Sequence, residues 1–344
     1  MLYAIVPIIV VMLLGYISGK KGVFTAKDGK AFNKVVLNYA LPAALFVSIV
    51  GADRQMLIED IKLTIISLVV IMACFMAVYF IYAKCFKGNT GAEGAIMALV
   101  NGSPTIGFLG FAVLQPIFGY DASVALVVAI VGIVVNAVGI PVGLSLLNAA
   151  QDKTSAAKTL ANGGTVTAGT ATVAVGMTPK GTPHRSSGWK AVLHALEQPV
   201  AWAPILAVIW VICGIPWPKY LDPSFDLIKG ANASMAVFAA GITLSAYKID
   251  INWAAILGTI LKMIVMPALL LVVGLIFKMG EKNLAMMVMA GALPPAFSGI
   301  IIADEYDCYV AESTSSLALS VVTFIGFCPF WMWCTDFCYQ HFLG

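Results

Sequence analysis

Long apolar runs alternate with short polar connections along the whole chain. A helix of about 20 apolar residues is long enough to cross the hydrocarbon core of a bilayer. Runs near this length predict ten helices, at residues 2–19, 33–51, 62–83, 92–118, 122–147, 193–215, 226–246, 253–277, 283–303 and 311–335. The pattern therefore predicts an all-α membrane protein with many crossings.

Two of these runs, the fourth and the ninth, are interrupted midway by residues that disfavour a helix. The fourth contains Asn101-Gly102-Ser103-Pro104-Thr105, and the ninth contains Leu293-Pro294-Pro295-Ala296-Phe297-Ser298. Proline has no N–H and its ring clashes with the preceding turn. At membrane depth a broken helix is tolerated only inside protein or beside a wet cavity. Paired interruptions in corresponding positions of two halves point to the binding site of a secondary transporter.

The predicted helices fall into two sets of five. Because an odd number of crossings reverses the direction of entry, residues 1–147 and 193–344 are expected to form two inverted five-helix repeats. The connection at 148–192 is rich in glycine, threonine and alanine, so we expect a flexible cytoplasmic linker. Lysine and arginine are more frequent after the first, third, fifth and seventh helices than in the other connections. By the positive-inside rule both termini are then outside, in a multi-pass protein of the cell membrane.

Composition and the absence of known motifs argue against several classes of function. The chain is 60% hydrophobic and only 11% charged, with a mean hydropathy of +0.94. Its net charge of +3 is too small to indicate a nucleic-acid partner, and its seven cysteines lack the spacing of a zinc site. No HExxH, Walker or GxSxG motif is present, and the three histidines are scattered. We therefore expect neither an enzyme nor a resident cofactor or metal.

Polar side chains at membrane depth are candidates for function, because burying them without partners costs free energy. A single serine or threonine can bond to its own helix, but an amide cannot satisfy both of its ends there. The expected substrate-binding residues are Asn38, Pro42, Asn101, Gly102, Ser103, Pro104, Thr105, Asn136, Leu293, Pro294, Pro295, Ala296, Phe297 and Ser298. Hydroxyl groups in the last helix form a candidate site for a coupling Na⁺ or H⁺, namely Thr314, Ser315, Ser316, Ser320 and Thr323.

The charged residues favour an anion as the substrate. No aspartate or glutamate falls in the middle of a predicted helix, which disfavours a cation substrate. Lys262 alone lies inside a helix, where we expect its long stem to snorkel toward the interface. An anion would then bind through backbone N–H groups and the positive ends of half-helices.

Five stretches of this sequence resemble the auxin efflux carrier family, the bacterial relatives of the plant PIN carriers. They are LNYALPAALF at 37–46, NGSPTIGFLG at 101–110, AVFAAGITL at 236–244, LKMIVMP at 261–267 and ALPPA at 292–296. The resemblance implies the inverted-repeat fold of bile-acid-type symporters. It also implies a scaffold domain of the first, second, sixth and seventh helices. The other six helices would form a transport domain that moves like an elevator.

The resemblance also carries expectations about the substrate. Bacterial members of this kind are usually assigned to small carboxylates such as malonate or malate, whereas the plant members carry an indole acid. A family asparagine maps onto Asn101, but the second interruption has no asparagine near Ala296–Ser298, which disfavours a plant-type aromatic substrate. An auxin-like or other carboxylate, a passive anion channel and a membrane sensor remain as alternatives. The coupling ion, the direction of transport and the formation of a homodimer also stay open.

One further pattern concerns helix packing. Gly15 and Gly19 have the GxxxG spacing that lets two helices approach closely. This spacing is commoner at contacts within one chain than at a dimer face, so we expect the first helix to pack against another helix of the same chain.

Overall fold

The computed structural model describes residues 2–50, 61–86, 90–120, 122–161, 199–246 and 250–343. These residues are helical throughout, apart from turns and one isolated β-bridge. The elements are α1 (Leu2–Lys20), α2 (Ala26–Val35), η1 (Val36–Ala40), α3 (Leu41–Val50), α5 (Ile61–Cys85), α6 (Ala92–Asn101), α7 (Ile106–Phe118), α8 (Ala122–Ile133), η2 (Val134–Gly139), α9 (Ile140–Ala161), α11 (Pro199–Cys213), η3 (Lys219–Leu221), α12 (Asp222–Ala246), α13 (Trp253–Ile260), η4 (Leu261–Val265), α14 (Met266–Ile276), α15 (Glu281–Ala292), α16 (Phe297–Glu305) and α17 (Val310–Phe342).

The helices have the length and surface of membrane spans. Within the described ranges, five are long and apolar enough to cross a bilayer, namely Lys62–Cys85, Ala122–Gln151, Lys219–Ala246, Trp253–Ile276 and Val310–Phe342. On α1, large apolar side chains recur at Val10, Leu13, Leu14 and Ile17 and are about half exposed. Such a stripe would be unfavourable in water and suits lipid. The all-helical membrane architecture is thus confirmed.

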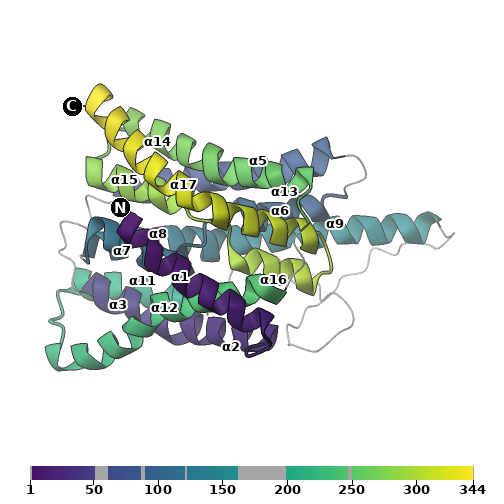
Figure 1. The fold of residues 1–344 in the computed structure, drawn as a ribbon. Helices are drawn as coiled ribbons and strands as arrows, with labels where there is room; N and C mark the ends of the chain where they lie inside the picture. Colours follow the sequence, from purple (N-terminus) through teal and green to yellow (C-terminus); the bar gives the residue numbers. More distant parts are fainter. Residues whose placement is uncertain are drawn as a thin grey trace.

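The helices form two groups in space. In Figure 1, α1, α2, α3, α11 and α12 lie together in the lower half, whereas α5, α13, α14, α15 and α17 lie in the upper half. Contacts agree with the view, because α1 runs along α12, α11 packs on α3, and α17 packs on α13 and α15. The beginning of α1 and the end of α17 lie at the same end of the molecule (Figure 1).

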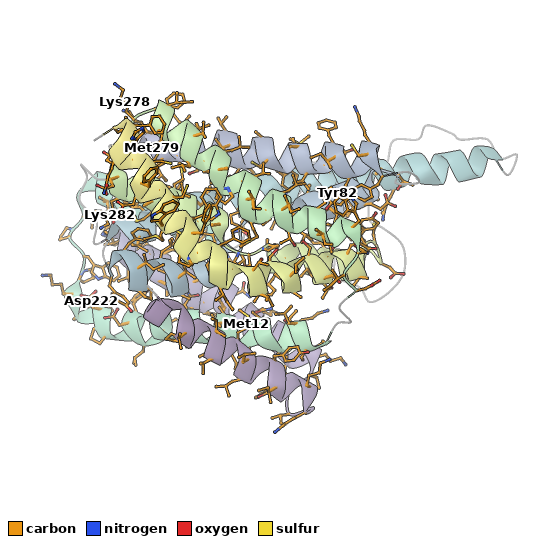
Figure 2. The ribbon with its side chains drawn as sticks, turned by 45° about the horizontal axis from the view of Figure 1, so that its top comes forward. Met12, Tyr82, Asp222, Lys278, Met279 and Lys282 are labelled. Atoms are coloured by element: carbon orange, nitrogen blue, oxygen red, sulfur yellow. The ribbon has the colours of Figure 1, made fainter. Side chains whose placement is uncertain are left out.

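The GxxxG pair of α1 packs inside the chain, as expected. A Cβ on Gly15 would overlap the carbonyl oxygen of Phe238 on α12, and one on Gly19 would overlap the Ser245 hydroxyl. The contact is reciprocal, since a Cβ on Gly241 would overlap the carbonyl oxygen of Met12. Figure 2 labels Met12 on α1. The two backbones therefore touch along their length, which ties α1 firmly to α12.

A matched pair of substitutions in α12 tests this contact. We expect Gly241→Ala to lower the thermal unfolding temperature in detergent, because overpacking costs about 1–3 kcal/mol. Gly230→Ala in the same helix has open space around it and should be neutral or slightly stabilising, since alanine favours a helix by about 0.5–1 kcal/mol over glycine. Equal unfolding temperatures for the two variants would contradict the tight α1–α12 contact.

Three helices contain a short π-helical segment that hydropathy did not predict. The segments η1, η2 and η4 each end two residues before a proline, at Pro42, Pro141 and Pro267. Because proline has no N–H, it leaves the carbonyl four residues earlier without its helical donor. For Pro267 that carbonyl belongs to Met263, and the indole Nε1 of Trp331 donates to it at 2.8 Å. The wider turns are therefore a consequence of the prolines.

Some helix bounds differ from those that hydropathy predicts. The helix α9 continues to Ala161, past the expected end at 147, and α17 continues to Phe342. The helix α2 begins at Ala26 rather than at 33, because the carboxylate of Asp28 accepts hydrogen bonds from the backbone N–H and hydroxyl of Thr25 at 2.7 and 2.8 Å. The remainder of the expected linker, at 162–192, lies outside the described residues.

Candidate functional site

Two broken helices meet at the centre of the molecule. The first break separates α6, which ends at Asn101, from α7, which begins at Ile106. The second separates α15, which ends at Ala292, from α16, which begins at Phe297. Pro104 and Pro295 form an isolated antiparallel β-bridge between the two non-helical connecting segments. Both interruptions expected from the sequence are confirmed, and the structure brings them together.

Each break supplies backbone partners to the other. The N–H of Thr105 donates to the carbonyl of Pro294 at 3.0 Å, and the N–H of Ala296 lies 3.2 and 3.1 Å from the carbonyls of Val100 and Ser103. Val100 lies four residues before Pro104 and so has no helical donor of its own. Since unpaired backbone groups are costly at membrane depth, the two breaks stabilise one another.

Glycine lets the two breaks approach this closely. A Cβ on Gly299 would lie 2.7 Å from the backbone N of Val100, and one on Gly102 would lie 2.8 Å from the Cα of Phe75. Real Cβ atoms do not come so near to backbone atoms, so a larger residue at 299 would push the breaks apart, and one at 102 would push the first break away from α5. We define the crossover as residues 101–105 and 293–298.

Two buried polar groups at the crossover have no partner in the protein. The side chain of Asn101 is fully buried, and its Oδ1 accepts a hydrogen bond from the Ser316 hydroxyl at 2.7 Å. The amide nitrogen Nδ2 of Asn101 and the hydroxyl of Thr105 are buried and unpaired. Because nearly all buried polar atoms in native proteins are paired, this donor and this hydroxyl are groups that a ligand or a bound water can pair.

The unpaired amide lies in a space that a glycine keeps open. A Cβ on Gly258 of α13 would lie 2.6 Å from the Asn101 Nδ2 and 2.9 Å from the Ser316 hydroxyl. The sequence did not single out this position or its neighbour Thr259, although both fall inside a predicted apolar run, at 253–277. The hydroxyl of Thr259 donates toward the Ala255 carbonyl at 3.0 Å and lies 3.3 Å from the Ser316 carbonyl.

The helices α7 and α16 both begin at the crossover. The first N–H groups of a helix have no helical partner and carry a partial positive charge. Near these ends, Gly107 and Ser298 are partly exposed, whereas Thr105 and Phe297 are buried. The crossover therefore combines helix N-termini, a free amide donor and a free hydroxyl, a combination that can bind an anion.

The remaining expected site residues lie around the crossover. On η1 and α3, Asn38 is partly exposed and Pro42 is buried, and the side chain of the adjacent Leu41 contacts the start of α7 beside Gly107. The Asn136 amide donates to the Gly132 carbonyl at 2.8 Å on its own helix, so one of its ends is satisfied locally.

The hydroxyl groups of α17 do not form one cluster. Ser316 bonds to Asn101, and the Ser320 hydroxyl lies 3.4 Å from that of Thr259. Ser315 instead accepts from the Asp250 N–H at 2.7 Å, and Thr314 and Thr323 donate to carbonyls of their own helix at 2.7 and 2.8 Å. Of the five residues, Ser316 and Ser320 are those that face the crossover side. Across the described ranges, no group of three or more His, Cys, Asp or Glu could hold a metal ion.

The position of Lys262 corrects an expectation. Its side chain is fully buried and does not snorkel. The ammonium Nζ donates to the carbonyl of Gly291 at 2.5 Å and lies 3.2 Å from the sulfur of Met266. The expectation was wrong because it considered the lysine alone and not the acceptor that the second break creates.

These features define a class of protein. An all-helical membrane protein in which two broken helices meet beside buried, unpaired polar groups is built as a transporter rather than as an enzyme. The family model described as "Membrane transport protein" matches residues 1–332, and the chain belongs to this family. The match also confirms the resemblance to auxin efflux carriers.

Individual relatives agree with the family. The chain is 48% identical over 329 residues to the "Uncharacterized transporter YfdV" of Escherichia coli (strain K12), covering 96% of both proteins. It is 22% identical over 331 residues to an "Uncharacterized transporter" of Methanothermobacter thermautotrophicus, covering 95% of this chain and 96% of the relative. It is also 25% identical over 145 residues to the "Probable auxin efflux carrier component 9" of Oryza sativa subsp. japonica, covering 39% of this chain and 33% of the rice protein.

Proposed function

We propose that this chain is a secondary transporter that moves a small organic anion, a carboxylate such as malonate or malate, across the cell membrane. The observation that carries the proposal is the crossover, where the free Asn101 amide and Thr105 hydroxyl lie beside the beginnings of α7 and α16. All of these groups can donate hydrogen bonds to a carboxylate. No aspartate or glutamate is buried among the side chains that the structure describes.

The close packing of the crossover supports a small substrate. Apart from Leu293 and Phe297, the crossover residues have short side chains, and glycines at 102, 258 and 299 bring neighbouring elements within contact distance. The second break offers Ala296 and Ser298 where the first offers Asn101, so an aromatic acid would have fewer polar partners there. A short carboxylate fits better than the auxin-like alternative.

The arrangement of the helices supports an elevator mechanism with inverted repeats. In this proposal α1, α2, α3, α11 and α12 form the scaffold, because glycines hold α1 against α12. The remaining helices carry the crossover and form the transport domain. The antiparallel bridge between Pro104 and Pro295 joins corresponding points of the two proposed five-helix repeats.

We further propose that both termini are outside the cell. The ends of the chain lie at one end of the molecule (Figure 1), and the labelled residues Asp222, Lys278 and Lys282 lie at that same end (Figure 2). Lys278 and Lys282 belong to the set of connections that carries fewer basic residues, which the positive-inside rule places outside.

Counterflow into proteoliposomes tests the proposed function. We expect that unlabelled malonate trapped inside will accelerate uptake of labelled malonate and that this uptake will saturate, because a carrier returns faster when loaded. The experiment is repeated with malate and with indole acetate to rank the substrates. A malonate flux that does not saturate and shows no counterflow would favour the channel alternative. No flux of any of these acids would contradict the proposed substrate class.

A further inference from the structure

The second break leaves a backbone carbonyl without its usual donor. In a continuous helix the carbonyl of Gly291 would accept a hydrogen bond from the N–H of residue 295. Residue 295 is proline and has no N–H. The carbonyl also lies in the last turn of α15, where the helix dipole places partial negative charge. This position attracts a cation.

The ammonium group of Lys262 occupies this position. It donates to the Gly291 carbonyl at 2.5 Å, and its side chain is fully buried. Its other polar neighbour is the Met266 sulfur at 3.2 Å. Among the described residues, no carboxylate forms an ion pair with it. The end of the half-helix is therefore its main source of compensating negative charge.

The corresponding carbonyl of the first break is treated differently. Val100 lies four residues before Pro104, as Gly291 lies four residues before Pro295. The carbonyl of Val100 accepts from a backbone N–H, that of Ala296. A charged side chain is thus used at one break only, although the geometry of the break does not require it.

In transporters with discontinuous helices, half-helix C-terminal ends and unwound carbonyls coordinate the coupling Na⁺ or H⁺. We propose that Lys262 is a tethered cation that takes the place of a coupling metal ion at the end of α15. The inference rests on the proposed transport function, because it explains how that transport proceeds without a coupling Na⁺. It assigns to Lys262 the task of holding the Pro294–Pro295 turn in place so that the crossover keeps its shape.

The proposal predicts that removing the lysine creates a site for a free cation. We expect purified Lys262→Ala to unfold at a lower temperature than the wild type in choline chloride. Methylammonium chloride, which resembles the end of the lost side chain, should raise that temperature by on the order of 3 °C at about ten times its dissociation constant. The wild type should show the same unfolding temperature in choline, sodium and methylammonium chloride.

Matched variants separate charge from packing. Lys262→Met fills the same space without charge, so it should respond to no cation. Lys262→Arg keeps the charge and should unfold nearer to the wild type than Lys262→Gln, which offers only a neutral donor. If Lys262→Ala cannot be purified, the comparison of the arginine and glutamine variants decides the question.

Several results would overturn the proposal. They are a wild type stabilised by Na⁺, equal cation responses in Lys262→Ala and the wild type, or equal unfolding temperatures for the arginine and glutamine variants. These measurements need no transported substrate. The unfolding measurements can therefore contradict the role of Lys262 while malonate counterflow supports the transport function, or the reverse. In a system that transports malonate, wild-type uptake should be equal with and without Na⁺.

Discussion

Replacing Asn101 by aspartate should nearly abolish malonate uptake while leaving the protein folded. Aspartate has the shape of asparagine and keeps an oxygen that can accept from the Ser316 hydroxyl, but it lacks the free Nδ2 donor. Losing one buried hydrogen bond costs about 1–3 kcal/mol, which corresponds to a loss of apparent affinity on the order of ten- to a hundredfold. The added negative charge repels an anion further.

Two companion variants isolate the donor. Asn101→Ala removes both ends of the amide and should lose affinity on the order of ten- to a hundredfold, as the removal of one donor predicts. Ser316→Ala removes the partner of Oδ1 but keeps Nδ2, so we expect a smaller loss. Concentration-dependent uptake into proteoliposomes gives the three affinities, and the unfolding temperature reports folding. Wild-type affinity in a folded Asn101→Asp protein would show that Asn101 does not contact the substrate.

Restoring helix continuity at the second break should separate stability from function. In Pro294→Ala/Pro295→Ala the new N–H groups can bond to the carbonyls of Ala290 and Gly291, so α15 and α16 can join. We expect the unfolding temperature to change little, because relief of a helix-breaking proline, about 3 kcal/mol, opposes the loss of the Ala296 bonds to Val100 and Ser103 and the competition with Lys262 for the Gly291 carbonyl. Malonate binding and uptake should fall together, because the N-terminal end of α16 is lost.

Controls for this variant come from a proline outside the crossover and from the other break. Pro329→Ala in α17 removes a proline from a helix that stays continuous, and it should leave uptake unchanged. Pro104→Ala should resemble the double variant. A folded double variant that transports malonate at the wild-type rate would mean that the breaks are simple kinks without a part in binding.

The sequence predicted the breaks well because their cause is local. A proline in an apolar run removes a helical hydrogen bond wherever the run folds, so Pro104 and Pro294–Pro295 mark the two interruptions without any knowledge of the fold. Each interruption lies in the fourth helix of its predicted set of five, and this correspondence also indicated that the two meet. The burial of Asn101 and Thr105 followed from the same reasoning.

The partners of individual side chains could not be predicted in this way. Which hydroxyl of α17 faces Asn101 depends on how that helix is rotated, although the i, i+4 spacing of Ser316 and Ser320 places these two on one face. Asn136, which bonds to Gly132, lies in a π-helical segment that hydropathy does not reveal. Lys262 was misjudged because its acceptor belongs to a different helix, α15.

The bridge between the breaks has a consequence for biosynthesis. When the first half of the chain enters the membrane, the carbonyl of Val100 and the N–H of Thr105 have no partner until Pro294 and Ala296 have been made. The early helices must therefore wait in a state that lipid alone cannot stabilise, with water, the insertion machinery or a second nascent chain as temporary partners. Final folding of the crossover is thus delayed until most of the protein has been translated.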